Sequence, residues 1–175
     1  MEKVFGKLVE KHYERIFNYI YALTSNYELS KDLTQETFIK AFLSFKRLRN
    51  KALFPIWILR IARNTSINRL RKEYLSKKRF ISLFTKVNGK ELMNSLVDPA
   101  ITPEEDVERK QEENIVRKAL HEIPPRMREV LVLREWEGLS YNQIGKVMGI
   151  SAKAVKSLIH RAREAMKDTV FSIPL

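Results

Sequence analysis

The chain has 175 residues and a formal net charge of +12 at pH 7, a size that suits one large domain or two small ones. Its hydrophobic fraction of 44% excludes global disorder, and the absence of cysteine excludes disulfide scaffolds and cysteine-ligated zinc or iron–sulfur sites. Only five glycines and six prolines stand among many Leu, Ile, Lys, Arg and Glu residues, which favours an all-α fold.

The first predicted helix runs from about Val4 to Thr24, where apolar residues recur at helical spacing. Charges recur too often in this segment for a signal peptide or a membrane span, so we expect a cytoplasmic protein that does not cross a membrane. A turn follows, and Ser30 is expected to cap a second helix that runs to about Arg47.

The second helix has two different faces. Phenylalanines gather on one side and are expected in the core. The other side carries acidic and amide groups beside two apolar side chains, which are Asp32, Gln35, Glu36, Ile39 and Leu43. Such a face fits a basic protein helix as a partner, although solvated charges with two scattered apolar residues would give the same pattern.

A third helix is expected to begin at Pro55, which suits a first turn, and to reach about Tyr74 or beyond. The segment Lys46–Arg79 holds 12 basic residues and one acid, a segregation typical of a nucleic-acid-binding surface. One stripe of the helix has helical spacing and comprises Arg60, Asn64, Ile67, Arg71, Tyr74 and Lys78. With Trp57 and the loop Arg49–Phe54, this stripe suits unpaired bases, although Trp57 and Phe54 fit the core as well.

The rest of the chain divides into a linker and a second helical region. Residues 76–101 lack a clear period, and the charge is balanced over residues 76–112. Further helices are expected at Thr102–Ile123, Arg126–Trp136, Ser140–Met148 and Ser151–Asp168. We therefore expect two helical domains, residues 1–75 (net +8) and residues 113–175 (net +4), joined by a linker over residues 76–112.

The segment at about 140–163 matches a helix-turn-helix. Gly145 supplies the small residue where two helices cross, and Gly149 supplies the turn. Ser140 and Ser151 are expected to cap the two helices. The apolar residues at matching positions are Ile144, Met148, Ile150, Val155 and Leu158. The polar face of the second helix can enter a major groove, whereas a plain helical hairpin would leave it solvated.

No pattern indicates an enzyme or a bound cofactor. His12, His121 and His160 are scattered without metal-ligand spacing, and no glycine-rich phosphate loop or nucleophile elbow is present. No small-molecule substrate is therefore expected. Two other classes remain: a dimeric helix-turn-helix repressor or activator, and a structural RNA-binding protein, which would leave the helix-turn-helix spacing unexplained.

Several segments resemble the group IV, or extracytoplasmic-function (ECF), sigma factors of the sigma-70 family. Asp32–Phe38 resembles the D-x-x-Q-E-x-F motif of region 2, and Phe54–Asn64 resembles the junction of regions 2.3 and 2.4. Ile123–Arg134 resembles the start of region 4, and Gly138–Glu164 resembles its helix-turn-helix. The resemblance covers both domains in order, without regions 1.1 and 3 of larger sigma factors.

The resemblance implies promoter-specific transcription initiation with core RNA polymerase, and an anti-sigma factor as a further partner. Region 2 would bind the clamp helices of the largest subunit, and region 4 the flap of the second-largest. The residues implied for polymerase binding are those of the acidic and apolar face. The residues that the resemblance implies for reading and melting the −10 element are Arg49, Asn50, Lys51, Phe54, Trp57, Arg60, Asn64, Arg71 and Tyr74. For the −35 element they are Ser151, Lys153, Ala154, Lys156, Ser157, His160 and Arg161.

Four positions depart from what the family often has. Asn68 stands in place of Asp, and Ala154 in place of Thr at the start of the recognition helix, where a hydroxyl could meet a phosphate. Leu158 stands in place of Arg, and Ile159 in place of the following Leu. These changes preserve the fold and bear on the −35 sequence preference.

Overall fold

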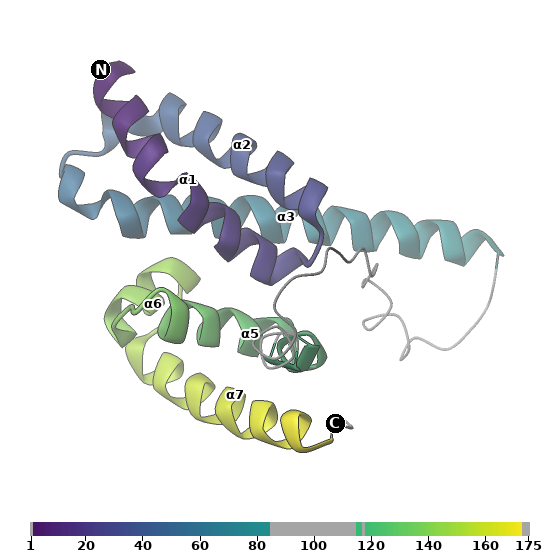
Figure 1. The fold of residues 1–175 in the computed structure, drawn as a ribbon. Coiled ribbons are helices and arrows are strands. Elements are labelled where there is room, and N and C mark those ends of the chain that lie inside the picture. The colour runs from purple at the N-terminus through teal and green to yellow at the C-terminus, as the bar shows by residue number, and fades with distance from the viewer. Residues whose placement is uncertain (1, 85–114, 117, 173–175) are drawn as a thin grey trace, which may run out of the picture. The chain divides into compact units, whose positions relative to one another are not determined.

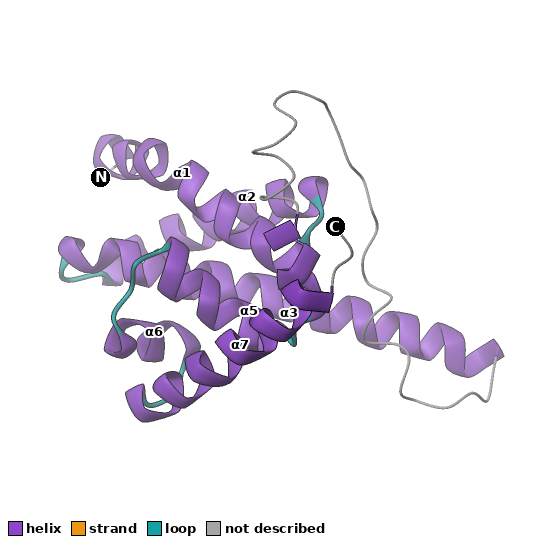
Figure 2. Ribbon diagram, turned by 60° about the horizontal axis from the view of Figure 1, so that its bottom comes forward, coloured by secondary structure: helices purple, strands orange, loops and turns teal. Residues whose placement is uncertain are grey.

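The computed structural model describes residues 2–84, 115–116 and 118–172, with side chains over residues 73–84 left undescribed. Within these residues all regular structure is helical, joined by short loops (Figure 2). The chain divides into two compact units, Met1–Asp98 and Pro99–Leu175. The expected linker beyond residue 84 and the expected helix start at Thr102 lie outside the described residues.

Over its described residues, 2–84, unit 1 is a three-helix bundle (Figure 1). Its helices are α1 (Glu2–Thr24), α2 (Tyr27–Ser44) and α3 (Phe54–Phe84), with the 3-10 turns η1 (Phe45–Arg47) and η2 (Lys51–Leu53) between α2 and α3. Each pair of helices is in contact, so each buries one apolar face against the other two. The predicted first helix is confirmed, and α3 extends to Phe84, into the segment expected to be linker.

The prediction that Ser30 caps the second helix is wrong. Asn26 is the cap, because its side-chain oxygen accepts a hydrogen bond from the backbone N–H of Leu29 at 2.8 Å. Ser30 lies inside the first turn with its side chain buried, and its hydroxyl donates to the carbonyl of Asn26 at 2.6 Å. Two residues therefore connect α1 to α2, which makes the turn tighter than the sequence suggested.

An aromatic cluster fixes the end of the bundle where α2 passes into α3. The ring of Phe5 lies 5.3 Å from Phe42, 5.1 Å from Phe45 and 6.2 Å from Phe54, in each case edge to face. Phe54 also lies 5.4 Å from the ring of His12 and is fully buried. The first turns of α1 are thereby held against the loop that leads into α3.

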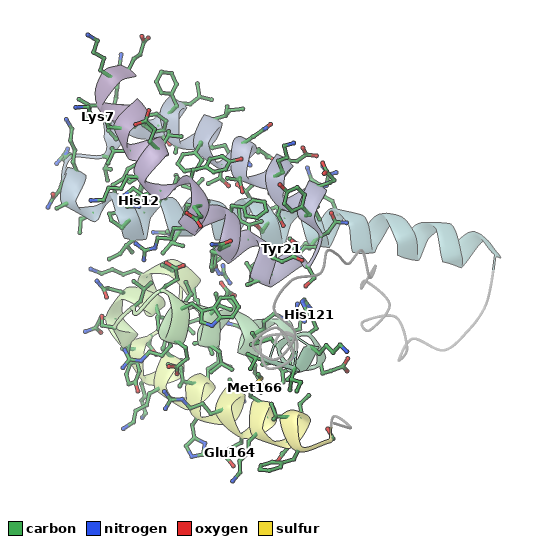
Figure 3. The ribbon with its side chains drawn as sticks, in the orientation of Figure 1. Lys7, His12, Tyr21, His121, Glu164 and Met166 are labelled. Carbon is green, nitrogen blue, oxygen red and sulfur yellow. The ribbon has the colours of Figure 1, made fainter. Side chains whose placement is uncertain are left out.

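His12 is a buried titratable side chain in unit 1 (Figure 3). Burial lowers the pKa of His12, and the cations Arg15 and Lys11 lower it further. Below about pH 6.5, His12 binds a proton more readily in the unfolded chain than in the folded chain. The free energy of unfolding therefore falls as the pH falls.

We expect the urea-unfolding midpoint of unit 1 to fall between about pH 7.5 and pH 5.5, and less steeply in His12→Gln. Trp57 fluorescence reports this unit in a Trp136→Phe background, because the chain has two tryptophans. His160→Gln, which alters an exposed histidine, serves as the control. An equally steep pH dependence in His12→Gln would contradict the assignment.

Unit 2 is a second helical bundle (Figure 1). A helix that includes residues 115–116 and 118–122 precedes α5 (Pro125–Leu131), which continues as the π-helix η3 (Val132–Trp136). The helices α6 (Tyr141–Met148) and α7 (Ala152–Ser172) follow. The predicted break at Pro124-Pro125 and the three helices after it are confirmed, within a few residues at their ends.

A buried arginine joins the first two helices of unit 2. Arg128 donates from Nε to the carbonyl of Leu120 and from Nη2 to the carbonyl of His121, each at 2.7 Å. These carbonyls lie in the last turn of a helix, where they lack partners within the helix itself. Burial lowers the pKa of Arg128 to about 10, so the side chain remains charged at neutral pH.

No helix within the described residues is both long enough and apolar enough to cross a membrane.

Candidate functional site

The predicted acidic and apolar face of α2 is exposed in the structure. Asp32, Gln35 and Glu36 are all exposed, and so are Ile39 (60%) and Leu43 (77%). They form one surface because the opposite side of α2 packs into the bundle core. Two large apolar side chains on one helix face beside carboxylates favour a protein partner with apolar and basic groups.

A polar contact connects this face of α2 to α3. Lys40 pairs with Glu36 at 2.6 Å, one helical turn away. Its ammonium also donates to the hydroxyl of Thr65 on α3 at 3.3 Å. Thr65 is buried and follows Asn64, a residue predicted to bind DNA. Lys40 therefore lies between the two faces that sequence reasoning assigned to different partners.

The loop before α3 has a defined shape. Asn50 caps the short turn η2, since its side-chain oxygen accepts a hydrogen bond from the N–H of Ala52 at 2.9 Å. The N–H of Leu53 donates to the carbonyl of Asn50 at 3.1 Å. Arg49, Asn50 and Lys51 are all exposed. The loop thus presents two cations and an amide on a turn whose backbone is held by its own hydrogen bonds.

The inclusion of Phe54 among the DNA-binding residues is corrected by the structure. Its side chain is 0% exposed, because it fills the space between Phe5, Phe45 and His12. A buried ring offers no face on which a base can stack. Phe54 therefore anchors the loop from inside the bundle, and Leu53 is the large apolar side chain that this loop exposes.

The outer face of α3 carries the other predicted −10 residues. Arg60, Asn64 and Arg71 are exposed and Trp57 is half-buried, with its ring 5.8 Å from that of Phe54. Ile58, Ala62 and Thr65 are buried on the opposite face. The side chain of Tyr74 lies outside the described residues. The structure therefore brings a row of cations and an amide together along one side of α3, as helical spacing predicted.

The helix-turn-helix of unit 2 matches its predicted local geometry. Ser140 and Gln143 form a reciprocal capping box at the start of α6, and the hydroxyl of Ser151 accepts from the N–H of Ala154 at 3.2 Å. Gly149 adopts the left-handed conformation, with φ of +69°. A Cβ on Gly145 would lie 2.6 Å from the carbonyl oxygen of Ile150, so only glycine fits this crossing.

The side chains of α7 separate into a buried and an exposed set. Val155, Leu158, Ile159 and Ala162 are buried against the rest of the unit. With Ser151, which directly precedes α7, the exposed set contains every residue predicted to meet the −35 element: Ser151, Lys153, Ala154, Lys156, Ser157, His160 and Arg161. The side chains that could bind bases or phosphates at this end of α7 therefore point away from the core.

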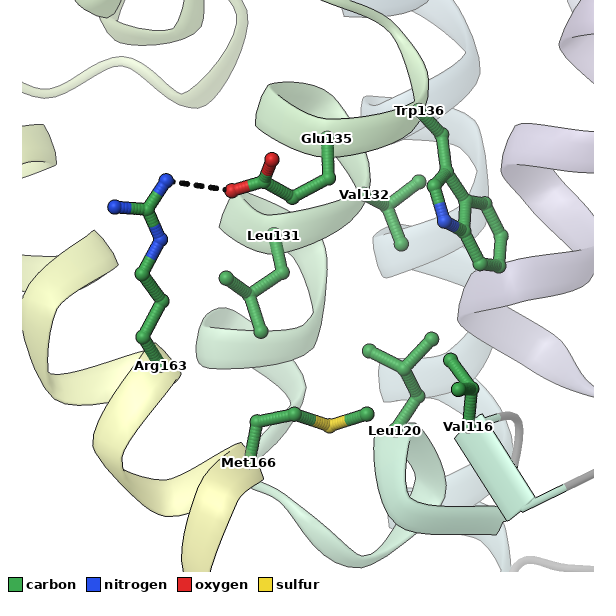
Figure 4. Close-up of a pocket in the computed structure, with 8 residues that line it drawn as sticks. All are labelled: Val116, Leu120, Leu131, Val132, Glu135, Trp136, Arg163 and Met166. Atoms are coloured by element: carbon green, nitrogen blue, oxygen red, sulfur yellow. Dashed lines mark hydrogen bonds and ion pairs between the residues drawn. The ribbon is translucent and has the colours of Figure 1, made fainter. Parts of the chain in front are cut away.

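Sequence reasoning missed an apolar groove in unit 2 (Figure 4). The groove has a volume of about 240 Å³, and its apolar lining consists of Val116, Leu120, Leu131, Val132, Trp136 and Met166. Arg163 and Glu135 form an ion pair at 2.7 Å on its rim. Trp136, which is 52% exposed, was predicted only as a helix end. The groove combines residues from the helix before α5, from α5 with its continuation η3, and from α7, and a helical period cannot reveal such a combination.

Comparison with known proteins assigns the family. Residues 8–75 match the family described as "Sigma-70 region 2", and residues 113–166 match "Sigma-70, region 4". The ECF RNA polymerase sigma factor SigW of Bacillus subtilis is 30% identical over 169 residues, which cover 95% of this chain and 88% of that protein. This chain belongs to the ECF sigma factors of the sigma-70 family. As a sigma factor it is a non-enzymatic protein that directs promoter-specific transcription initiation by RNA polymerase.

Other relatives agree with this assignment. The RNA polymerase sigma factor YlaC of Bacillus subtilis is 31% identical, over 93% of this sigma factor and 90% of YlaC. The sigma factor RpoE of Bartonella quintana, solved with the anti-sigma factor NepR, has the same fold, with a TM-score of 0.74 and 20% identity. That match covers 98% of this chain and 99% of RpoE. Membership of the family excludes the repressor and RNA-binding alternatives.

Proposed function

We propose that the α2 face binds the clamp helices of the largest RNA polymerase subunit. The residues that would make this contact are Asp32, Gln35, Glu36, Ile39 and Leu43. The observation that carries the proposal is the exposure of Ile39 and Leu43 beside three polar groups, on a helix whose other side is core. Burial of the two apolar side chains would supply affinity, and the carboxylates would select a basic partner.

The loop before α3 and the outer face of α3 would read and melt the −10 element. Arg49, Lys51, Arg60 and Arg71 would bind phosphates, and Asn50, Trp57 and Asn64 would meet unpaired bases. All of these side chains are at least partly exposed. Tyr74, whose side chain is not described, remains part of the proposal from its spacing alone.

The exposed N-terminal half of α7 would enter the major groove of the −35 element. Its polar residues would divide between phosphate contacts, which position the helix, and base contacts, which specify the sequence. Ala154 cannot donate a side-chain hydrogen bond, so Lys153 and Lys156 would be the nearest charged donors. The apolar groove beside Trp136 offers unit 2 a surface for the flap of the second-largest subunit.

Lys156→Ala and Arg161→Ala are each expected to weaken −35 binding by the holoenzyme, by about 1–3 kcal/mol for a base contact and less for a phosphate contact. Each removes an exposed cation and leaves the buried face of α7 intact. Run-off transcription on a matched and a scrambled −35 sequence measures the effect. Lys167→Ala, which removes an exposed lysine further along the same helix, is the control. Equal loss on both sequences would identify the residue as a phosphate contact.

RNA polymerase would hold the two units at the separation of the two promoter elements. Two units that each bind DNA weakly have a high combined affinity for the promoter when one partner holds both, because the second contact is then intramolecular. The free chain would bind promoter DNA weakly and with steep salt dependence. The protein would act in the cytoplasm, and an anti-sigma factor would hold it inactive. In support, the similar sigma factor RpoE was solved in complex with the anti-sigma factor NepR.

The experiment that tests this function is run-off transcription with core RNA polymerase across a genomic promoter library. We expect specific transcripts that depend on the added chain. Gel filtration with and without core polymerase measures complex formation in the same preparation. A chain that neither joins the polymerase nor starts a specific transcript would contradict the proposal.

A further inference from the structure

The turn before α3 presents one large apolar side chain to solvent, and it belongs to Leu53. Leu53 is 47% exposed, whereas the adjacent Phe54 is fully buried. The other exposed groups of this loop include the cations Arg49 and Lys51 and the amide of Asn50. An isolated exposed leucine is ordinary on a protein surface, so its significance depends on the groups that surround it.

Leu53 is held rigidly from both sides. On one side, the cap by Asn50 and the hydrogen bond from the N–H of Leu53 to the carbonyl of Asn50 close the turn. On the other side, Phe54 is fixed by the rings of Phe5, Phe45 and His12. The side chain therefore points outward from a backbone that local contacts hold in place, so little backbone entropy remains to be lost when it meets a partner.

The setting of Leu53 fits the chemistry of a melted duplex. A base that leaves the stack exposes the apolar faces of its neighbours, and proteins that open DNA often cover such faces with an inserted aliphatic side chain. Cations on either side of such a wedge can bind the flanking phosphates. Arg49 and Lys51 precede Leu53 in the same exposed loop and can supply these charges.

We propose that Leu53 enters the space that a flipped −10 base leaves, and thereby stabilises the melted promoter. This inference depends on the proposed role of the loop at the −10 element. It assigns the contact to Leu53, which the fold exposes, whereas Phe54, which the resemblance placed among the −10 residues, is buried. Leu53 acts on melting, and the bases themselves are read by other groups of the loop and of α3.

The test compares Leu53→Ala with the unaltered chain in holoenzyme, on a duplex promoter and on one with mismatches across the −10 element. On the duplex we expect about tenfold fewer open complexes, measured by permanganate reactivity of unpaired thymines, because one aliphatic contact is lost. On the mismatched promoter, where the base is already unpaired, the two chains should agree within about twofold. Leu53→Gln should behave like Leu53→Ala, and Leu53→Met should retain most of the activity.

Controls separate this inference from the proposed function of the loop. Val4→Ala shortens another exposed aliphatic side chain, 44% exposed on α1, and should leave open complexes unchanged. Equal opening of the duplex by Leu53→Ala and the unaltered chain would overturn the inference, and so would an equal defect on both promoters. Arg49→Gln with Lys51→Gln tests the loop itself. If Leu53→Ala and the Arg49→Gln with Lys51→Gln variant both open and discriminate promoters normally, the proposed −10 role of the loop is wrong. If only the Arg49→Gln with Lys51→Gln variant is defective, the loop keeps its role and only the inference about Leu53 is wrong.

Discussion

Reversal of both carboxylates on the α2 face, in Asp32→Lys with Glu36→Lys, is expected to weaken binding to core RNA polymerase by about 100-fold or more. The two lysines would face the basic groups that the carboxylates attract, and like charges at close range oppose docking. Both positions are exposed, so the bundle should keep its helicity. The lost pair between Glu36 and Lys40 is a surface pair and costs about 0.5 kcal/mol.

The measurement is co-purification with core polymerase, with circular dichroism as the check on folding. Glu10→Lys with Glu14→Lys makes the same change in charge on the exposed face of α1 and is the matched control. If the control binds normally and the α2 variant does not, the effect belongs to the α2 face. Unaltered co-purification of the α2 variant would refute the assignment of that face to the polymerase.

The second large effect is expected from Gly145→Ala. A Cβ at this position would lie 2.6 Å from the carbonyl oxygen of Ile150, a backbone atom that cannot move without opening the turn between α6 and α7. We expect unit 2 to lose about 2–4 kcal/mol of unfolding free energy. The affinity for the −35 element should also fall, because α7 would no longer keep its angle to α6.

Gly6→Ala provides the control for the loss of glycine in a helix. A Cβ at Gly6 meets no atom within 4 Å, and the residue is exposed on α1. There the change should stabilise the helix by about 0.5–1 kcal/mol. For Gly145→Ala, urea unfolding followed by Trp136 fluorescence in a Trp57→Phe background reports unit 2. For Gly6→Ala, Trp57 fluorescence in a Trp136→Phe background reports unit 1. A Gly145→Ala chain with unchanged stability and −35 binding would show that the crossing tolerates a methyl group.

Local rules predicted most of the helices and the helix-turn-helix. Helical periodicity depends only on near neighbours, so α1, α6 and α7 were evident before any packing was known. The caps by Ser140 and Ser151 are also local, since each involves a residue three positions away. The exposure of Asp32 and Glu36 followed from spacing as well, because the opposite side of the helix is apolar.

Non-local contacts decided the remaining features. Asn26 and Ser30 are both good caps, and the choice between them depends on how tightly α1 turns into α2. Phe54 could be exposed or buried by sequence, and it is buried because Phe5, nearly fifty positions earlier, lies against it. The groove beside Trp136 likewise depends on helices that meet only in the folded unit.

The difference between the features that the sequence predicted and those that it did not has a simple physical origin. Hydrogen bonding within a helix and the direction of each side chain around its axis depend on residues a few positions apart, so the order of residues suffices to specify them. Burial depends on which side chains converge from distant elements, and it is set by packing at close to crystalline density. The order of residues therefore specified the helices and their polar faces, whereas packing decided that Leu53, and not Phe54, meets the solvent.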